Sequence, residues 1–476
     1  MRVGLQRLPV LVGVGLAVLL SGVLRQVRHP FLEHDDWGFL LPVTEQRTAQ
    51  MHDRLLWEGR WFNYGWWRVI GHLFSPAAVS VLFTIGVLGL AAVVALRWAS
   101  GWFVVPTVVA LAASPMLGDL SSWPATLAAS MVLLAVAALA LPHCVGDPRR
   151  LSAWTVVSTL LIFLAYPPFT LILLVLLGAE LAQRTLRELV VGVAVFCASY
   201  VAGTLVSFSL NALVLGHFGV KVLPWRRPHP VHGIGDLLEN LRRAADQLGE
   251  LLGTYTIPLV LGLLALLACW VLPHLRERTL RFAAVLVVAL GIQASATVLT
   301  GVFTPSRATG WLWFVVVLPL VWLFENGAAP AARPAKRWTS LGAPVALVAL
   351  VALVVVCGWG ARYWHRAMDD DQHQREVLQR VLDSLERNAA AHPGDRVVVF
   401  GSSQDWRSSQ FAAEAQYLTD KASHDHGLSL TSCRPPVCDV ALRPSVLARA
   451  DRGARSFVST QFVIVVPPAH KDSLAH

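Results

Sequence analysis

The chain has 476 residues, of which 55% are hydrophobic and only 14% are charged. Soluble proteins carry about a quarter charged residues, so the composition excludes an ordinary soluble enzyme and predicts a polytopic membrane protein. The net charge is +9, but the basic residues recur in short clusters between apolar runs. That distribution is typical of membrane-protein loops and does not indicate a nucleic-acid-binding face.

Eleven apolar segments are candidates for membrane-spanning helices, each of which needs about 20 residues. The first follows the basic start MRVGLQR and has no small-residue cleavage site after it, so we read it as an uncleaved helix. The prolines of the YPP sequence at 166–168 must turn the chain if the segments beside them are separate spans. The expected segments are 7–24, 76–96, 101–117, 124–142, 152–166, 168–183, 189–215, 255–273, 282–302, 309–325 and 340–361.

Basic residues in the short loops predict the orientation of these spans. With a cytoplasmic N-terminus, every short loop on the cytoplasmic side carries an arginine or a lysine. On the other side, LGDLSSWP and YPP carry none, and FTPSRATG carries only Arg307. An odd number of spans then places the C-terminal region outside.

The spans and their loops occupy residues 1–362, with long external loops at 25–75 and 216–254. In the second of these loops, GDLLENLRRAADQLGELL has apolar residues at helical spacing and predicts a helix on the membrane surface. Residues 363–476 are expected to form a separate, small α/β domain. There QREVLQRVLDSLERN reads as a helix, and DRVVVFG and SFVSTQFVIVVPP read as strands.

Cys433 and Cys438 flank the sequence RPPV in this C-terminal region. In an oxidising compartment the two thiols are expected to form a disulfide. Metal binding is the weaker alternative, because no second pair of ligands is evident.

The stretch FLEHDDWGF places two adjacent carboxylates, Asp35 and Asp36, shortly after the first span. Two adjacent acidic residues in a loop are usually exposed to solvent and have no special role. Its aromatic and apolar neighbours, including Trp37, indicate instead that the segment lies against the protein, where a carboxylate can accept a proton or bind a cation. His34 either tunes the pair or is a polar neighbour without a role.

The same loop continues with LLWEGRWFNYGWWRVIGHLF. Trp66 and Trp67, just before the next span, fit the usual role of interfacial anchors. Trp57, Arg60 and Trp61 suit a phosphorylated sugar, because aromatic rings stack on sugars and guanidinium groups bind phosphate in a forked geometry.

Three further arginines are candidates for binding a phosphate group. Arg307 either stabilises negative charge that develops on a substrate or snorkels to the membrane interface. Arg226 and Arg227 lie in KVLPWRRPHPVH, whose basic residues suit either a substrate phosphate or anionic lipid head groups.

Taken together, these features resemble the GT-C superfamily of membrane glycosyltransferases. The acidic pair in the first external loop, followed by W-E-G-R-W at 57–61, is most similar to bacterial polyprenyl-phosphate-sugar-dependent glucosyltransferases of the O-antigen-modifying type. The similarity in topology covers about residues 1–360 and does not extend to the C-terminal region.

The resemblance implies an inverting transfer of a sugar from a polyprenyl-phosphate donor to a cell-envelope glycan or glycolipid, at the outer face of a bacterial plasma membrane. Neither a nucleotide nor a nucleic acid is an expected partner. Asp35 is expected to be the general base, and Asp36 to position the acceptor or to hold a divalent cation, although the two roles could be exchanged. The expected substrate-binding residues are His34, Trp37, Trp57, Arg60, Trp61, Arg226, Arg227 and Arg307.

Two functions from other classes remain open. A flippase or transporter of lipid-linked sugars would carry ionisable residues inside its spans, whereas the acids here gather in an external loop. A non-catalytic assembly protein would tolerate the loss of both aspartates.

Overall fold

The computed structural model describes residues 7–20, 36, 39, 54–222, 226–328 and 342–366, and four strands between residues 396 and 465. The chain divides into two compact units. The first consists of Met1–Pro30 and Pro42–Ala367, and the second consists of Phe31–Leu41 and Met368–His476. The segment that contains Asp35 and Asp36 therefore belongs to the same unit as the C-terminal region.

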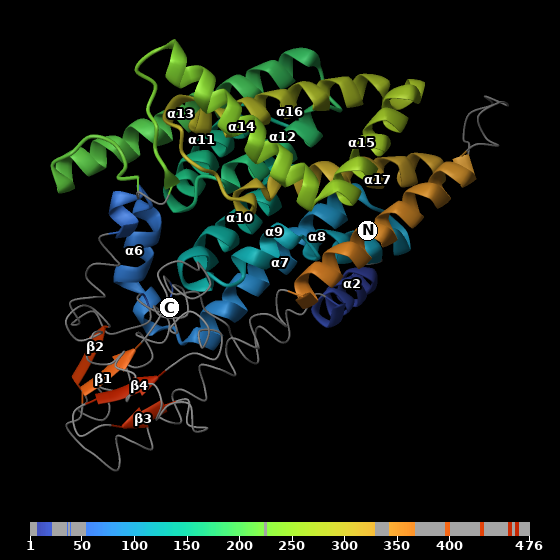
Figure 1. Ribbon diagram of the computed structural model, residues 1–476. Coiled ribbons are helices and arrows are strands. Elements are labelled where there is room, and N and C mark those ends of the chain that lie inside the picture. Colours follow the sequence, from blue (N-terminus) through green and yellow to red (C-terminus); the bar gives the residue numbers. More distant parts are fainter. Residues whose placement is uncertain are drawn as a thin grey trace. The chain divides into compact units, whose positions relative to one another are not determined.

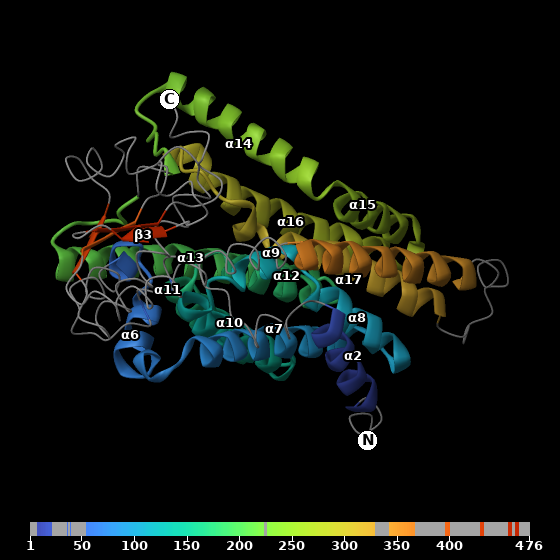
Figure 2. The same ribbon diagram turned by 60° about the horizontal axis from the view of Figure 1, so that its bottom comes forward.

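The first unit is helical (Figures 1 and 2). Prolines start many of its helices at their first positions, where a missing N–H costs nothing. Its helices and 3₁₀ turns are α2 (Arg7–Leu20), α6 (Trp61–Val69), η1 (Gly71–Leu73), α7 (Pro76–Trp98), η2 (Gly101–Phe103), α8 (Val104–Ala112), α9 (Pro115–Leu120), α10 (Pro124–Cys144), α11 (Pro148–Ala165), α12 (Phe169–Leu181), α13 (Leu186–Leu215), α14 (Ile234–Thr254), α15 (Thr256–Val271), α16 (Pro273–Thr300), η4 (Ser306–Thr309), α17 (Trp311–Ala328) and a last helix at Gly342–Arg366.

Among the described residues, six helices are long and apolar enough to cross a membrane. They are Ala77–Trp98, Pro124–Cys144, Leu186–Leu215, Pro273–Thr300, Ser306–Asn326 and Gly342–Arg366. A seventh span is possible if α14 and α15, which meet at an angle of 94°, count as one broken span. The expectation of a helical, multi-pass membrane protein is therefore confirmed, whereas the described residues contain fewer than the expected eleven spans.

Part of the difference in number comes from apolar helices too short to span a membrane, of which α12 is enclosed by other helices. The break at YPP separates α11 from α12, as expected, but α12 has only 13 residues and all of them are buried. Such a helix is about 20 Å long, less than the thickness of a membrane core. A hydropathy pattern cannot distinguish an enclosed half-length helix from a lipid-exposed span.

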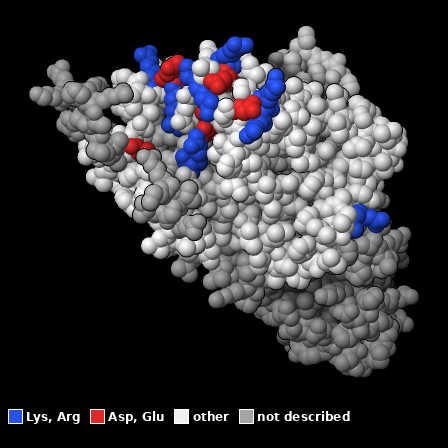
Figure 3. All heavy atoms as spheres, turned by 180° about the vertical axis from the view of Figure 1, so that it is seen from behind, with Lys and Arg blue, Asp and Glu red and all other residues white. Residues whose placement is uncertain are grey.

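The outer surface of the long helices is apolar. On α13 Leu213 is 82% exposed, and on α16 Val287 is 69% exposed. Seen from behind, charged side chains gather in one part of the surface, beside a broad uncharged area (Figure 3). Contiguous exposed apolar surface of this kind is unfavourable in water and is suited to lipid.

The predicted amphipathic helix is present as α14, and it has three faces. Leu238, Leu241 and Leu248 form an exposed apolar stripe, and acidic and basic residues line another face. Asn240 and Leu251 lie on a third, buried face, with which α14 packs against α16. These faces suit a helix at a lipid–water boundary that is also attached to the bundle; its contact with a membrane stays a prediction.

The second unit contains a four-stranded sheet with the order β2-β1-β4-β3. The strands are β1 (Arg396–Val399), β2 (Ser429–Ser432), β3 (Ser456–Val458) and β4 (Phe462–Val465). β1 is parallel to both β2 and β4, and β3 is antiparallel to β4. The predicted strand segment 395–401 contains β1, and 456–468 contains β3 and β4. The predicted helix at 374–388 and the cysteine pair Cys433 and Cys438 lie outside the described residues.

Candidate functional site

The W-E-G-R-W sequence forms a tight turn that leads into α6. Gly59 has a φ of 76°, in the left-handed region that favours glycine. A Cβ atom at this position would lie 2.2 Å from the Ser207 Oγ of α13, so the turn and α13 are in close contact. The next residue, Arg60, forms an ion pair of 2.8 Å with Glu58.

Asparagine and tryptophan side chains attach α6 to the spans. Asn63 is buried and donates hydrogen bonds to the carbonyl oxygens of Thr126, at 2.7 Å, and Ala165, at 2.8 Å. Trp67 is 1% exposed, and its Nε1 donates to the Ala125 carbonyl oxygen at 2.8 Å. The interpretation of Trp67 as an interfacial anchor is therefore wrong, because the ring is enclosed by protein. Trp66 is partly exposed and stacks on Phe74.

Trp57 and Trp61, expected to stack on a sugar, both have protein contacts. The Nζ atom of Lys221 lies 4.3 Å from the centre of the Trp57 ring. The Nε1 of Trp61 donates to Asn211 Oδ1 at 2.9 Å, and Asn211 in turn donates to the Gly219 carbonyl oxygen. Both rings thus hold the first loop against the segment that follows α13. A contact with sugar stays a prediction for the ring surfaces that these partners leave open.

Arg60, Arg226 and Arg307 come from three separate loops and lie close enough for their charges to interact. We call them the arginine cluster. Burial lowers the pKa of Arg226, and so do the positive charges of Arg60 and Arg307, whereas the charge of Glu58 acts in the opposite direction. Proximity follows from the backbone, because the Phe303 amide donates to the Arg226 carbonyl oxygen at 3.0 Å and so brings the two later loops together. Three predicted substrate-binding residues are thereby gathered at one end of the bundle.

Aromatic rings surround the arginine cluster. The guanidinium carbon of Arg60 lies 5.2 Å from the centre of the Tyr166 ring, and that of Arg307 lies 4.3 Å from the centre of the Trp123 ring. Cation–π contacts of this kind orient a guanidinium group and leave its N–H groups directed sideways. Arg307 makes no ion pair with any residue that the structure describes. Arg307 therefore carries a positive charge that no described ion pair compensates, and binding of a phosphate group at the cluster stays a prediction.

Asp119 is the residue of this region that the sequence did not single out. It lies in α9, which packs against η4, and its Oδ2 accepts a hydrogen bond of 3.3 Å from the Tyr363 hydroxyl. Burial raises the pKa of Asp119 to about 7, although the hydrogen bond from Tyr363 and the charge of Arg307 act in the opposite direction. In the sequence, Asp119 differs from its surroundings in one way: it is the only charged residue of the loop LGDLSSWP. That loop was used above only because it lacks basic residues.

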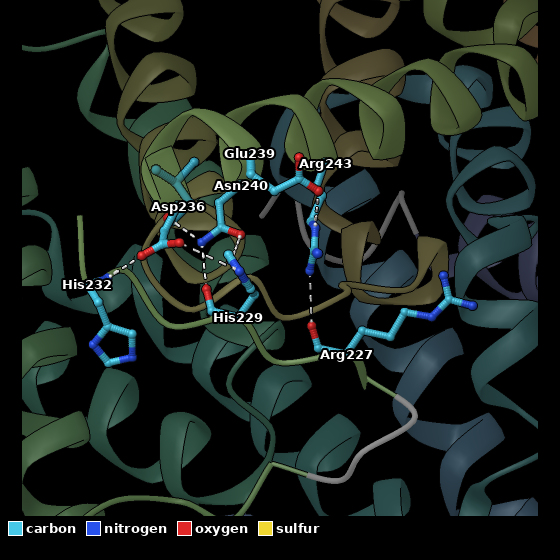
Figure 4. Close-up of polar contacts among 8 residues, drawn as sticks. Arg227, His229, His232, Asp236, Glu239, Asn240 and Arg243 are labelled. Atoms are coloured by element: carbon cyan, nitrogen blue, oxygen red, sulfur yellow. Dashed lines mark hydrogen bonds and ion pairs between the residues drawn. The ribbon is translucent and has the colours of Figure 1, made fainter. Parts of the chain in front are cut away.

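Arg227 is not placed with the arginine cluster. It is exposed and has a φ of 48°, which turns the backbone sharply after Arg226. Its carbonyl oxygen accepts a hydrogen bond from Arg243 of α14, while its side chain extends away from Arg243 (Figure 4). Two adjacent arginines thus have different surroundings, and only Arg226 interacts with Arg60 and Arg307.

The residues after Arg227 attach α14 to the bundle. Asn240 Nδ2 donates to the carbonyl oxygens of His229, at 2.8 Å, and Val298, at 3.2 Å. The His232 amide donates to Asp236 Oδ2 at 2.9 Å (Figure 4). These hydrogen bonds attach the segment from His229 to His232 to the first turns of α14.

The acid pair is described only in part. Asp36 is helical and fully buried, with 0% of its surface exposed. Its neighbours Asp35, His34 and Trp37 lie outside the described residues. Among the described residues, no three His, Cys, Asp or Glu side chains are grouped as metal ligands. A divalent cation at Asp36 stays a prediction.

Comparison with known proteins leaves the family open. No protein-family model, no characterised protein and no solved structure matches this chain. What can be concluded from its geometry is a helical multi-pass membrane protein with a cluster of arginines and aromatic rings at one end of the bundle.

Proposed function

We propose that the protein is an inverting glycosyltransferase that moves a sugar from a polyprenyl-phosphate donor to a glycan or glycolipid acceptor of the cell envelope. The arginine cluster is the observation that carries this proposal. It joins guanidinium groups from three loops with the rings of Trp123 and Tyr166, at one end of an apolar bundle. A donor of this class has the matching parts: a phosphate group, a sugar ring and a long apolar chain.

In the proposed reaction one carboxylate of the acid pair, with Asp35 as the first candidate, accepts the proton of an acceptor hydroxyl. The resulting oxygen attacks the anomeric carbon while the bond from that carbon to the phosphate oxygen breaks on the opposite face. The products are the glycosidic bond, with inverted configuration, and polyprenyl phosphate. Arg226 and Arg307 stabilise the negative charge that develops on the leaving phosphate, which is where positive groups lower the barrier most.

The first test replaces Asp35 and Asp36 singly by asparagine, with Asp246→Asn as a control on the exposed face of α14. Each variant is checked for insertion and purification, and the envelope glycans of cells that carry it are compared with those of cells that carry the parent protein. A glycan branch that is lost with either acid-pair variant, but kept with Asp246→Asn, supports the transferase. Unchanged glycans in both acid-pair variants would contradict a catalytic role for the pair.

A second measurement separates a transferase from a transporter. The purified protein in detergent micelles is mixed with polyprenyl-phosphate-linked sugars and an envelope glycan extract, and the release of polyprenyl phosphate is followed. A transferase releases it without any membrane that separates two compartments, whereas a flippase does not. Donor that stays intact with every acceptor fraction would favour the transporter.

A further inference from the structure

A second group of charged and aromatic residues lies at the end of the bundle opposite the arginine cluster. Here the C-terminal ends of α7, α12 and α17 meet the first turns of α16. Arg97 of α7 forms a two-pronged ion pair with Glu180 of α12, in which its Nε lies 2.8 Å from Oε2 and its Nη2 contacts Oε1. Arg278 of α16 lies near enough for the charges of both Glu180 and Arg97 to act on it.

Arg278 has hydrogen-bond donors without acceptors. Its guanidinium carbon lies 3.8 Å from the centre of the Trp322 ring, so the group is stacked and held in place. Its Nε and Nη2 atoms are buried and make no hydrogen bond within the described part of the chain. The same is true of the indole Nε1 atoms of Trp322 and, beside Glu180, of Trp98.

Glu180 does not pair with both Arg97 and Arg278. Both carboxylate oxygens of Glu180 are engaged by Arg97, and Arg278 forms no ion pair with a described residue. A buried guanidinium group without a counter-charge is costly, and so is each unpaired N–H donor. A single negative charge that carries several acceptor oxygens would correct both deficits.

We propose that Arg278, which is partly exposed and is held in place by the enclosed Trp322 ring, binds the phosphodiester head group of an anionic phospholipid. A phosphodiester carries one negative charge and two free oxygens, which matches one uncompensated arginine. Exposed apolar side chains are present near the same end of the bundle, such as Leu280 in the first turns of α16 and Val271 at the end of α15, so acyl chains have an apolar surface there. Basic sites between spans commonly bind anionic lipid in this way. The proposal is independent of the glycosyltransferase function.

The test measures the thermal unfolding midpoint of the detergent-purified protein by its tryptophan fluorescence. Phosphatidylglycerol, phosphatidylcholine or inorganic phosphate is added in separate titrations. We expect phosphatidylglycerol to raise the midpoint by about 3–5 °C at saturation and the other two to leave it within about 1 °C. An equal rise with phosphatidylcholine would contradict recognition of the charge. An equal rise with inorganic phosphate would show an anion site that does not require lipid, and would also overturn the proposal.

Arg278→Gln is the decisive variant, and Arg276→Gln is its matched control. Arg276 is exposed two residues earlier and lies 5.6 Å from the Trp270 ring. The rise with phosphatidylglycerol should disappear in Arg278→Gln and persist in Arg276→Gln. A full rise in Arg278→Gln would overturn the proposal. If that variant does not fold, native mass spectrometry of the parent protein decides: retained phosphatidylglycerol, displaced only by other anionic lipids, supports the site, and its absence contradicts it.

Discussion

The two ends of the helical bundle use arginine in different ways. At one end, Arg60, Arg226 and Arg307 come from loops, and Arg307 has an aromatic ring beside it but no carboxylate partner among the described residues. At the other end, Arg97 joins the ends of two helices through Glu180. Arg307 is available to a ligand because no described residue forms an ion pair with it, whereas the paired Arg97 contributes to the connection between helices. Changes at Arg307 should therefore affect function, and breaking the Arg97–Glu180 pair should affect stability.

Arg307→Gln should have the largest effect on function. We expect the rate of sugar transfer to fall about 100- to 1000-fold, because a donor directed at developing charge is lost. The unfolding midpoint should change little, since the side chain forms no ion pair with a described residue. The measurement is turnover of the polyprenyl-phosphate donor by purified protein, with Arg227→Gln as the control. Equal losses of transfer rate in Arg307→Gln and Arg227→Gln would contradict a special role for the arginine cluster.

Glu180→Gln should lower the stability of the protein. The substitution removes the buried carboxylate that Arg97, itself 40% exposed, contacts with two of its nitrogens. Losing one partner of a partly buried, charged hydrogen bond costs about 1–3 kcal/mol of folding free energy. Unfolding of the detergent-purified variant by heat or denaturant measures the loss. Glu239→Gln, which removes the exposed ion pair with Arg243 on α14, should change stability by only about 0.5 kcal/mol. Similar values for the two variants would contradict the structural role of the Glu180 pair.

Gly59→Ala tests the turn that positions Arg60. The left-handed backbone and the contact with Ser207 predict that the free energy of unfolding falls by about 1–3 kcal/mol. Gly65→Ala is the control, because Gly65 lies within α6 with nothing near its Cβ position, and alanine there should be neutral or stabilising. Adding Ser207→Ala to Gly59→Ala should recover the part of the loss that is due to the clash. A tolerated Gly59→Ala would contradict the described turn.

Asp119 should make a smaller, pH-dependent contribution. Because burial raises its pKa to about 7 from the ordinary value of 3.8, the folded state holds the proton more tightly than the unfolded state does. The stability that this group contributes is therefore complete below about pH 4 and is lost as the pH rises through about 7. In Asp119→Asn the unfolding midpoint should change less between pH 5 and pH 8 than it does in the parent protein. All measurements use the same salt concentration, because salt screens charge interactions. Asp246→Asn, at an exposed position, should leave this pH dependence unchanged.

Much of the local structure could be predicted from the sequence. Apolar runs and prolines specify helices through interactions within a few residues, which explains why α7, α10 and α13 lie where the hydropathy pattern places them, whereas α16 begins at Pro273, before the predicted start at 282. The amphipathic α14 was predicted from its spacing for the same reason. The number of spans was overestimated at α12, because hydropathy records that a residue avoids water and does not record whether lipid or protein surrounds it.

The candidate site could be predicted only in part. Arg60, Arg226 and Arg307 were singled out by residue type, but their proximity depends on contacts between distant segments, such as the bond from Phe303 to Arg226. Arg227 has the same residue type as its neighbour, and only the left-handed backbone at that residue separates the two. Asp119 was missed because a single aspartate in a short loop has no pattern around it.

The sequence by itself determined that the chain is a helical membrane protein, where most of its helices begin and end, and which residue types could bind a phosphate group. These properties follow from composition, period and local backbone preference. The tertiary structure decided which arginines gather and which are paired, that Trp67 is enclosed, and that Asp119 faces the same region as Arg307. Those features arise from packing and electrostatic interactions between residues far apart in the chain, and no local pattern encodes them.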